Sequence, residues 1–214
     1  EIYTLSLHDA LPISGDAFNS IIRLETIRPS KPLNPMINAG AIAVDSLILG
    51  QSIEERFNRL LAFFRQLCHN DQLWYDEAVF ASESATGYRN RALAHFMKDA
   101  GVLEGEVEDV LALYFRQCSI RVTCREIAML GAVLAHDGIS PITGEQLVPK
   151  ELASLVKTFM TTCGMYDASG QFAVRVGFPA KSGVGGGIMG AVPHMMGIGV
   201  FGPALDEKGN SAGG

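Results

Sequence analysis

The sequence predicts an α+β fold, in which a helical region precedes an antiparallel sheet. Apolar residues recur at helical spacing in several segments between Asn38 and Met160. Beyond Met160 the chain changes to short alternating or glycine-rich segments that end near Phe201. Because helices and strands are grouped, we do not expect the alternating βαβ units of a parallel sheet.

The first predicted helix begins at Asn38 and runs through small apolar residues to about Leu49. Pro29, Pro32 and Pro35 precede it and favour an extended approach, because proline restricts itself and the residue before it. Asn38 has two interpretations that the sequence leaves open. Its side chain could cap the helix, or it could present its carboxamide to a ligand at the helix start.

Two capping boxes mark later helices. Ser52 and Glu55 begin a helix that runs to about Cys68, and Thr123 and Glu126 begin another that ends before the turn at residues 137–138. Apolar residues follow each box at helical spacing, so both helices have a buried face. Further helices are predicted over residues 107–118 and 149–160.

Glu83 and Asn90 lead into a helix that Gly101 ends, after a connection over residues 71–81. The two residues are seven positions apart, so they would share a face of one continuous helix. Gly87 lies between them and could break that helix. The sequence leaves both possibilities open.

Residues 171–178 are predicted to form a half-buried strand. Phe172, Val174, Val176 and Phe178 alternate there with smaller or polar neighbours, which is the period of a strand. This strand should lead toward Lys181 in the segment that follows.

That segment, AKSGVGGGI at residues 180–188, has three interpretations. Its glycines match a dinucleotide-binding pattern, but that pattern requires a helix to open there, and the residues up to Gly202 predict two more strands. It could be a glycine-rich hairpin without a functional role. It could also be the Lys-Ser/Thr-Gly strand of penicillin-recognising serine enzymes, which borders their acyl site. Exposed N–H groups there could stabilise an oxyanion.

Composition limits the classes of partner. The 214 residues are 48% hydrophobic and 19% charged, which allows a sizeable core. A net charge of −6 without a basic cluster argues against nucleic acid or an anionic membrane as the main partner. No apolar run reaches the length of a transmembrane helix.

Cys68, Cys118, Cys124 and Cys163 lack the spacing of a zinc site, and we expect no metal or other cofactor. We interpret the four as reduced, buried cysteines of a cytoplasmic protein. A catalytic thiol at Cys163 is the alternative. Residues 1–14 fit poorly with the rest and look like translated sequencing-adapter text, so we suspect a non-native segment before Gly15.

Six ordered motifs carry a resemblance to a known family: NPMINAGAI, ESATGYRNRALA, YFRQCSI, TCREIAMLGAVLAHDG, TTCGMYD and AKSGVGGGI. Together they closely resemble the bacterial and mitochondrial-type glutaminases of the serine β-lactamase-like fold, from about Gly15 to the end. The resemblance implies hydrolysis of L-glutamine to L-glutamate and ammonia through a serine acyl-enzyme. It also implies a homo-oligomer.

The resemblance assigns roles to individual positions. Glu83 is the natural partner of the substrate ammonium, and Asn38 and Asn90 can bind its carboxylate or amide. Val184 would offer its backbone N–H to the oxyanion. Tyr114 and Tyr166 are candidate proton relays with lowered pKa values, and Lys181 is the third candidate catalytic residue. The substrate-binding set, which we expect to converge on one pocket, is Asn38, Glu83, Asn90, Tyr114, Tyr166 and Val184, and the catalytic set is Tyr114, Tyr166 and Lys181.

The family's Ser-x-x-Lys lies N-terminal to the GDAFNS text, where the suspect first residues stand, and relatives continue beyond the C-terminus. We therefore expect a domain truncated at both ends, which releases almost no ammonia from glutamine. Ser154 and Lys157 have the required spacing, but we interpret them as a chance match on a peripheral helix. The alternatives are a non-catalytic fragment that retains the fold, or another serine amidohydrolase of that fold, related to β-lactamases and transpeptidases.

Overall fold

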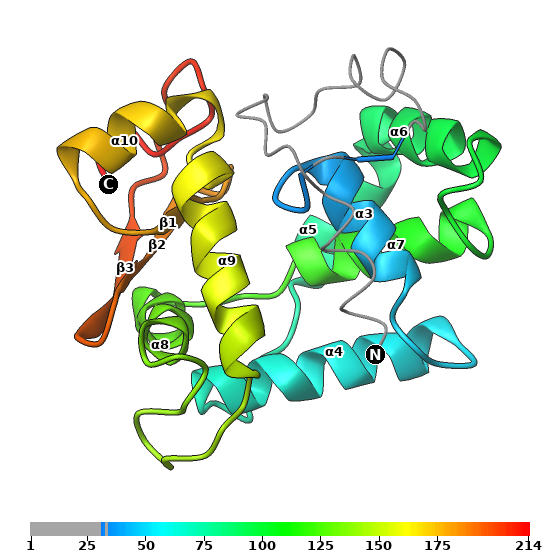
Figure 1. The fold of residues 1–214 in the computed structure, drawn as a ribbon. Coiled ribbons are helices and arrows are strands. Elements are labelled where there is room, and N and C mark those ends of the chain that lie inside the picture. The colour runs from blue at the N-terminus through cyan, green and yellow to red at the C-terminus, as the bar shows by residue number, and fades with distance from the viewer. Residues whose placement is uncertain (1–30, 33) are drawn as a thin grey trace. The chain divides into compact units, whose positions relative to one another are not determined.

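The computed structural model describes residues 31, 32 and 34–214, which form two compact units. Unit 1 contains the described residues up to 62 together with residues 73–121, and unit 2 contains residues 63–72 and 122–214. The suspected non-native segment, residues 1–14, lies outside the described residues. Unit 1 is helical, whereas unit 2 adds an antiparallel sheet to its helices (Figure 1). The described residues thus confirm the predicted order of helices before strands.

The helices of unit 1 enclose a hydrophobic core to which α3, α6 and α7 contribute. Ile42 of α3, Leu93 of α6 and Leu111 of α7 are fully buried there. The helix bounds are α3 (Asn38–Ser46), α5 (Glu77–Thr86), α6 (Tyr88–Asp99) and α7 (Val107–Cys118), and α4 (Ile53–Cys68) begins in unit 1 and ends in unit 2.

The structure decides between the two interpretations of Asn38 as far as the helix cap is concerned. Asn38 does not cap α3, since the cap residue is Ile37 and the Asn38 side chain donates to Asn90. The predicted connection over residues 71–81 ends early, because Asp76 caps α5 by accepting hydrogen bonds from the amides of Ala78 and Val79 at 2.9 and 3.0 Å. An aspartate before Glu77 was a helix-start signal in the sequence.

Gly87 separates α5 from α6, so Glu83 and Asn90 lie on different helices. A Cβ at Gly87 would lie 2.5 Å from Cζ of Phe115 and 2.7 Å from the carbonyl oxygen of Glu83. Only glycine allows this close approach to α7.

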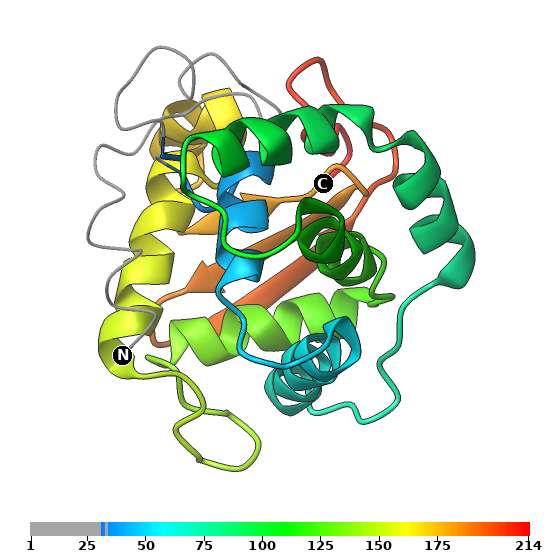
Figure 2. The same cartoon turned by 90° about the vertical axis from the view of Figure 1, so that its right-hand side faces the viewer.

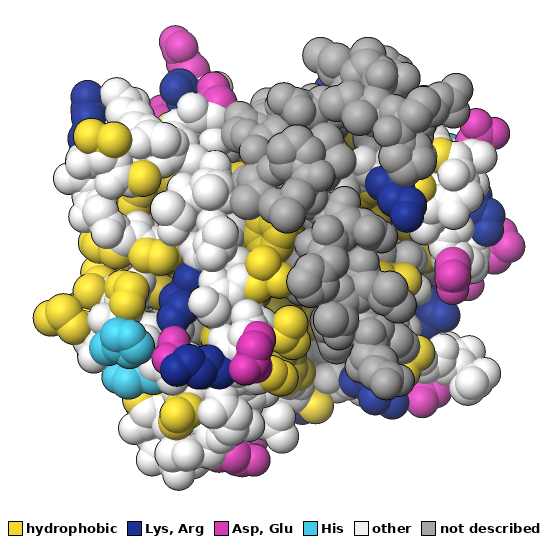
Figure 3. Space-filling model, viewed as in Figure 1, with side chains coloured by type: hydrophobic (Ala, Val, Ile, Leu, Met, Phe, Trp, Pro, Cys, Tyr) yellow, Lys and Arg dark blue, Asp and Glu magenta, His cyan; other side chains and the backbone are white. Residues whose placement is uncertain are grey.

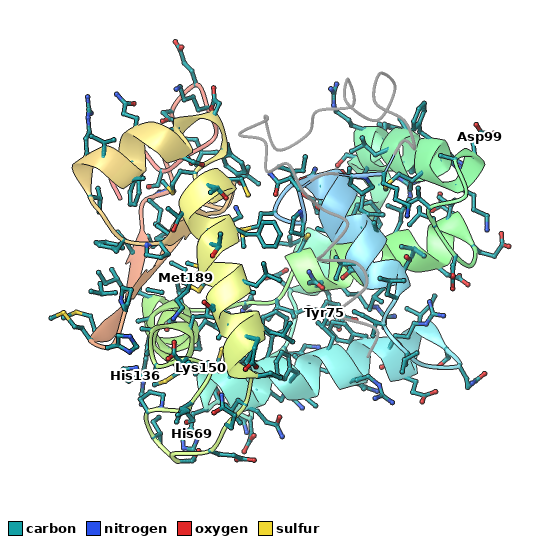
Figure 4. The ribbon with its side chains drawn as sticks, viewed as in Figure 1. His69, Tyr75, Asp99, His136, Lys150 and Met189 are labelled. Carbon is teal, nitrogen blue, oxygen red and sulfur yellow. The ribbon has the colours of Figure 1, made fainter. Side chains whose placement is uncertain are left out.

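Arg116 of α7 fills an aromatic enclosure in unit 1. Its guanidinium carbon lies 5.6 to 5.7 Å from the ring centroids of Phe57, Tyr75 and Phe80, and Nη1 donates to Glu54 at 2.6 Å. Figure 4 labels Tyr75 in this cluster. The cation therefore joins α4, α5 and α7 within unit 1.

We expect Arg116→Ala to lower the free energy of unfolding by about 2 kcal/mol, because it removes a partly desolvated cation–π contact and an ion pair. Urea denaturation measures this change. Arg121→Ala is the matched control, since the Arg121 side chain is 77% exposed and its nearest carboxylate oxygen, on Asp76, is 3.9 Å away. Equal effects of the two substitutions would contradict a specific role for Arg116.

Unit 2 contains a three-stranded antiparallel sheet of order β1-β2-β3, with strands β1 (Ala180–Ser182), β2 (Gly187–Val192) and β3 (Met196–Phe201). The sheet confirms that no helix opens at the glycines. Helix α8 (Cys124–Ala135), yellow-green in Figure 2, lies along the orange and red strands. A Cβ at Gly197 would lie 1.9 Å from the carbonyl oxygen of Ala128, so the glycines of β3 allow α8 to pack directly on the strand backbone.

The predicted strand over residues 171–178 is wrong, because residues 169–175 form helix α10 (Ser169–Arg175). Phe172 packs edge-to-face on Phe178 with 6.1 Å between ring centroids, while Val174 is 87% exposed. A run of four alternating residues is too short to establish a strand, and here the two valines of the run, Val174 and Val176, are both exposed, whereas the two phenylalanines are partly buried. The other helical elements of unit 2 are α9 (Lys150–Cys163) and the 3₁₀ helix η1 (Tyr166–Ala168).

The surface of unit 2 carries exposed apolar side chains at the β2–β3 hairpin. Met195 and Met196 are 66% and 50% exposed, and Figure 3 shows hydrophobic and histidine side chains together at this left-hand edge. Within the described residues, no helix combines the length and the apolarity needed to cross a bilayer.

Candidate functional site

The predicted site residues fall into two groups. Unit 1 holds Asn38, Glu83, Asn90 and Tyr114, and unit 2 holds Tyr166, Lys181 and Val184. The convergence of both groups on one pocket stays a prediction.

In unit 1 the two predicted amide side chains bond to each other. Nδ2 of Asn38, at the start of α3, donates to Oδ1 of Asn90 on α6 at 2.9 Å. This bond fixes the orientation of both carboxamides relative to the helices that carry them. Glu83 lies in the last turn of α5 and is exposed.

Tyr114 lies on α7 and is 7% exposed. Burial raises the pKa of its hydroxyl well above the ordinary value, and a hydrogen bond with Cys118 and the carboxyl groups of Asp45 and Glu83 add to the shift. The expected lowered pKa is therefore wrong for this tyrosine. The same interactions place Glu83 and Asp45 in the electrostatic surroundings of Tyr114.

Asp45 is a buried acid that the sequence analysis missed. It is 2% exposed, and its Oδ2 has no hydrogen-bond partner within the described part of the chain. Burial raises the pKa of this carboxyl to about 8. Asp45 follows Asn38 by seven positions and thus lies near the same face of α3. A single acid within the apolar run AIAVDSLIL was the available signal.

In unit 2, β1 presents Lys181 to Tyr166. Nζ of Lys181 lies 4.5 Å from the centroid of the tyrosine ring and 3.5 Å from its hydroxyl, and it also contacts the carbonyl oxygen of Ser182. The Tyr166 hydroxyl donates to that carbonyl at 3.1 Å. Burial lowers the pKa of Lys181 to about 8, against a smaller opposing effect of Cys163. Lys181 can therefore exchange a proton near neutral pH.

Tyr166 opens η1 with a left-handed backbone, φ 53°, and is 3% exposed. An aromatic residue rarely adopts this conformation, which costs free energy unless surrounding contacts hold it. Burial raises the pKa of Tyr166 to about 12. The expected lowered pKa is wrong here too, so the hydroxyl stays protonated and can donate.

Val184 lies in the tight turn between β1 and β2. The Gly183 amide bonds the Gly187 carbonyl, and the Gly186 amide bonds the Gly183 carbonyl, each at 2.9 Å. Among the described residues, the Val184 N–H makes no backbone hydrogen bond, and the residue is 48% exposed. This amide is available for a negatively charged oxygen.

Ser154 and Lys157 lie on α9, where Ser154 is exposed. Nζ of Lys157 donates to Oδ1 of Asp137 at 2.8 Å, and Lys150, labelled in Figure 4, approaches Oδ2 of the same carboxylate at 3.2 Å. An ammonium held by a carboxylate is a poor base for the serine hydroxyl. The structure therefore favours the interpretation as a chance match.

Within the described residues none of the four cysteines forms a disulfide. Cys68 and Cys163 are buried, whereas Cys118 and Cys124 are exposed, so the predicted burial is wrong for these last two. Sγ of Cys163 lies 3.1 Å from the carbonyl oxygen of Phe159, and burial raises its pKa. A thiol with a raised pKa is a weak nucleophile, which argues against a catalytic Cys163.

Comparisons with known proteins agree with these observations. A family model described as Glutaminase matches residues 11–214. The chain is 58% identical to the glutaminase of Alkaliphilus metalliredigens over 94% of this chain and 66% of the relative. It is 57% identical to a glutaminase of Clostridium botulinum over 92% of this chain and 65% of the relative. The chain thus spans about two thirds of the length of these curated relatives.

Solved structures are similar over most of the chain. A Bacillus glutaminase crystallised with 4.3 M NaCl has a TM-score of 0.93 and 48% identity, over 98% of this chain and 72% of that one. A Bacillus subtilis glutaminase, bound covalently to 5-oxo-L-norleucine after reaction with 6-diazo-5-oxo-L-norleucine, has a TM-score of 0.82 and 46% identity, over 89% of this chain and 68% of that one. These likenesses confirm the predicted α+β, β-lactamase-like fold.

Proposed function

The chain belongs to the glutaminase family, and from this membership we propose that it carries the glutamine-binding and oxyanion-stabilising part of an enzyme that hydrolyses L-glutamine to L-glutamate and ammonia through a serine acyl-enzyme. The observation that supports the proposal most is the contact between Tyr166 of η1 and the desolvated amine of Lys181. Lys181 lies on β1, which leads into the turn with the available Val184 amide.

Unit 1 supplies groups that match the amino-acid part of glutamine. The exposed carboxylate of Glu83 binds the α-ammonium in a charge-assisted hydrogen bond. Asn38 and Asn90 fix each other, so that their remaining donors and acceptors can meet the carboxylate or the side-chain amide.

Unit 2 supplies groups that match the reacting amide. When a serine oxygen attacks the amide carbon, the carbonyl oxygen becomes an oxyanion, and the Val184 N–H donates to it. The serine proton passes to the lysine of the family's Ser-x-x-Lys pair as the serine oxygen attacks. The departing nitrogen takes a proton from the Tyr166 hydroxyl and leaves as ammonia, and the hydroxyl regains one from the Lys181 ammonium, whose nitrogen lies 3.5 Å away. The proton that the serine released returns to Lys181 through water, and a water molecule then hydrolyses the acyl-enzyme to L-glutamate and restores the serine.

Other serine amidohydrolases of the same fold are the second candidate class. The small polar set of Asn38, Glu83 and Asn90 favours an amino-acid amide over a bulky lactam. The resemblance to glutaminases also supports a homo-oligomer in the cytoplasm, and light scattering of the purified protein tests the oligomer.

Ammonia release tests the proposal. One arm uses the chain as it stands, and a second arm uses an extended chain, which adds the remaining third of the Alkaliphilus metalliredigens relative. We expect the extended chain to hydrolyse L-glutamine much faster than L-asparagine or a β-lactam. Preferential hydrolysis of a β-lactam, or no hydrolysis of glutamine, would overturn the proposal. Loss of turnover on Ser154→Ala would instead assign the nucleophile to α9.

A further inference from the structure

The backbone around Tyr166 is held from two sides. On one side, the Ser169 hydroxyl accepts a hydrogen bond from the Met165 amide at 3.0 Å and donates to the Tyr166 carbonyl at 2.7 Å. On the other side, Nδ2 of Asn210 donates to the Met165 carbonyl at 3.3 Å. Both backbone groups of Met165 are thus bonded by side chains immediately before the left-handed residue.

Asn210 reaches this position from a loop that is itself ordered by hydrogen bonds. The Asp206 carboxylate accepts from the amides of Lys208 and Asn210, each at 2.9 Å, and the Asp206 amide donates to the Asn210 carbonyl at 2.8 Å. Asn210 is 3% exposed, and its Oδ1 has no partner among the described residues. Burying an amide side chain with one unpaired end costs free energy. The hydrogen bond at its other end, from Nδ2 to the Met165 carbonyl, therefore indicates what the buried Asn210 side chain contributes.

We propose that Asn210 is a positioning residue, which holds the left-handed conformation of Tyr166 and so keeps the tyrosine hydroxyl beside the Lys181 amine. The catalytic consequence rests on the proposed function, whereas the positioning itself concerns only contacts within unit 2. Without the Asn210 donor, the Met165 carbonyl loses its hydrogen bond, and only the Met165 amide stays bonded to a side chain. Tyr166 can then relax to an ordinary backbone conformation. Its ring then moves off Lys181, and water reaches the amine.

The groups that surround Lys181 allow a specific measurement. Among the described residues, Tyr166 covers the amine, and Cys163 of α9 is a further titratable group that acts on it. Desolvation is the main reason for the lowered pKa of Lys181. The Lys181 titration therefore reports whether the tyrosine still covers it, which overall stability does not.

The test follows the ¹³Cε shift of isotopically labelled lysine against pH, with the Lys181 signal assigned by its loss in Lys181→Met. We expect a midpoint of about 8 in the parent, and in Asn210→Leu a midpoint higher by about one unit or more. Ser169→Ala removes the hydrogen bonds of the Ser169 hydroxyl to the Met165 amide and the Tyr166 carbonyl, and it should move the Lys181 midpoint in the same direction. This variant replaces Asn210→Leu in the test if Asn210→Leu does not fold. Glu207→Leu, at an exposed position of the same loop, should leave the midpoint unchanged. A folded Asn210→Leu or Ser169→Ala with the parent midpoint overturns the proposal.

A kinetic arm tests the catalytic consequence in the extended chain. We expect Asn210→Leu to lower kcat about tenfold with little change in KM, and to have no further effect once Tyr166→Phe is present. Additive effects of the two substitutions would contradict positioning through Tyr166. If the extended chain does not hydrolyse glutamine at all, the proposed function fails, while the Lys181 midpoint still decides the role of Asn210.

Discussion

Lys181→Met is expected to make the chain more stable and, in the extended chain, to lower kcat by about 10²- to 10⁴-fold. Both effects result from the burial of the Lys181 amine. Burial makes the amine costly to charge, and it lowers the pKa to a value at which the amine can exchange a proton near neutral pH. Its pKa is about 8 in the folded chain, against an ordinary value of 10.5. Below pH 8 the folded state holds a charge that the unfolded state would solvate better, and this penalty disappears as the pH rises from 8 to 10.5.

Removing that penalty should raise the free energy of unfolding at pH 7 by about 2–3 kcal/mol. Urea denaturation at pH 7 and pH 10 measures it, with the difference between variant and parent shrinking at the higher pH. In the extended chain, kcat of the parent should fall above pH 8 as the Lys181 ammonium loses its proton, and the variant should lack this step. Lys150→Met is the control, because the Lys150 side chain is 70% exposed. A less stable but fully active Lys181→Met would refute the assignment.

Asp45→Asn should stabilise unit 1. Burial raises the Asp45 pKa from 3.8 to about 8, so the folded state keeps the proton while the unfolded state releases it above pH 3.8. Below pH 3.8 the Asp45 carboxyl therefore does not lower the free energy of unfolding. From pH 3.8 to about pH 8 it lowers that free energy progressively more, and above pH 8 it lowers it by a constant amount. At pH 7 we expect Asp45→Asn to add about 3 kcal/mol to the free energy of unfolding.

Denaturation between pH 4 and pH 8 checks this prediction, because the gain should grow across that interval. Asp99→Asn, at an exposed position labelled in Figure 4, is the matched control and should give no such slope. A gain independent of pH would mean that Asp45 is charged in the folded chain.

Local signals in the sequence predicted much of the fold. The box of Thr123 and Glu126 is present in full. Gly87 separates α5 from α6, at a position where Phe115 leaves no room for a side chain. The helix over residues 169–175 was missed because Phe172 and Phe178 meet only in the folded chain. Short alternation cannot distinguish a strand from a helix without knowledge of such contacts.

The candidate site was predictable only in part. Motifs pointed to Lys181 and to the two tyrosines, Tyr114 and Tyr166. The pKa of a tyrosine depends on its burial, however, and burial raises the pKa values of both tyrosines rather than lowering them. Asp45 and Asn210 lie outside any motif. Their importance comes from an unpaired buried oxygen and from a contact across 45 positions, neither of which has a local sequence pattern.

Binding of L-glutamine to the chain, followed by ligand-observed NMR, tests the central claim most directly. We expect the parent to bind L-glutamine in preference to D-glutamine. Glu83→Gln should weaken binding about tenfold or more, because it removes a charge-assisted hydrogen bond to the substrate ammonium. Glu77→Gln, at an exposed position of the same helix, should bind as the parent does. Equal binding by parent and Glu83→Gln, or no preference between the two enantiomers, would contradict the account.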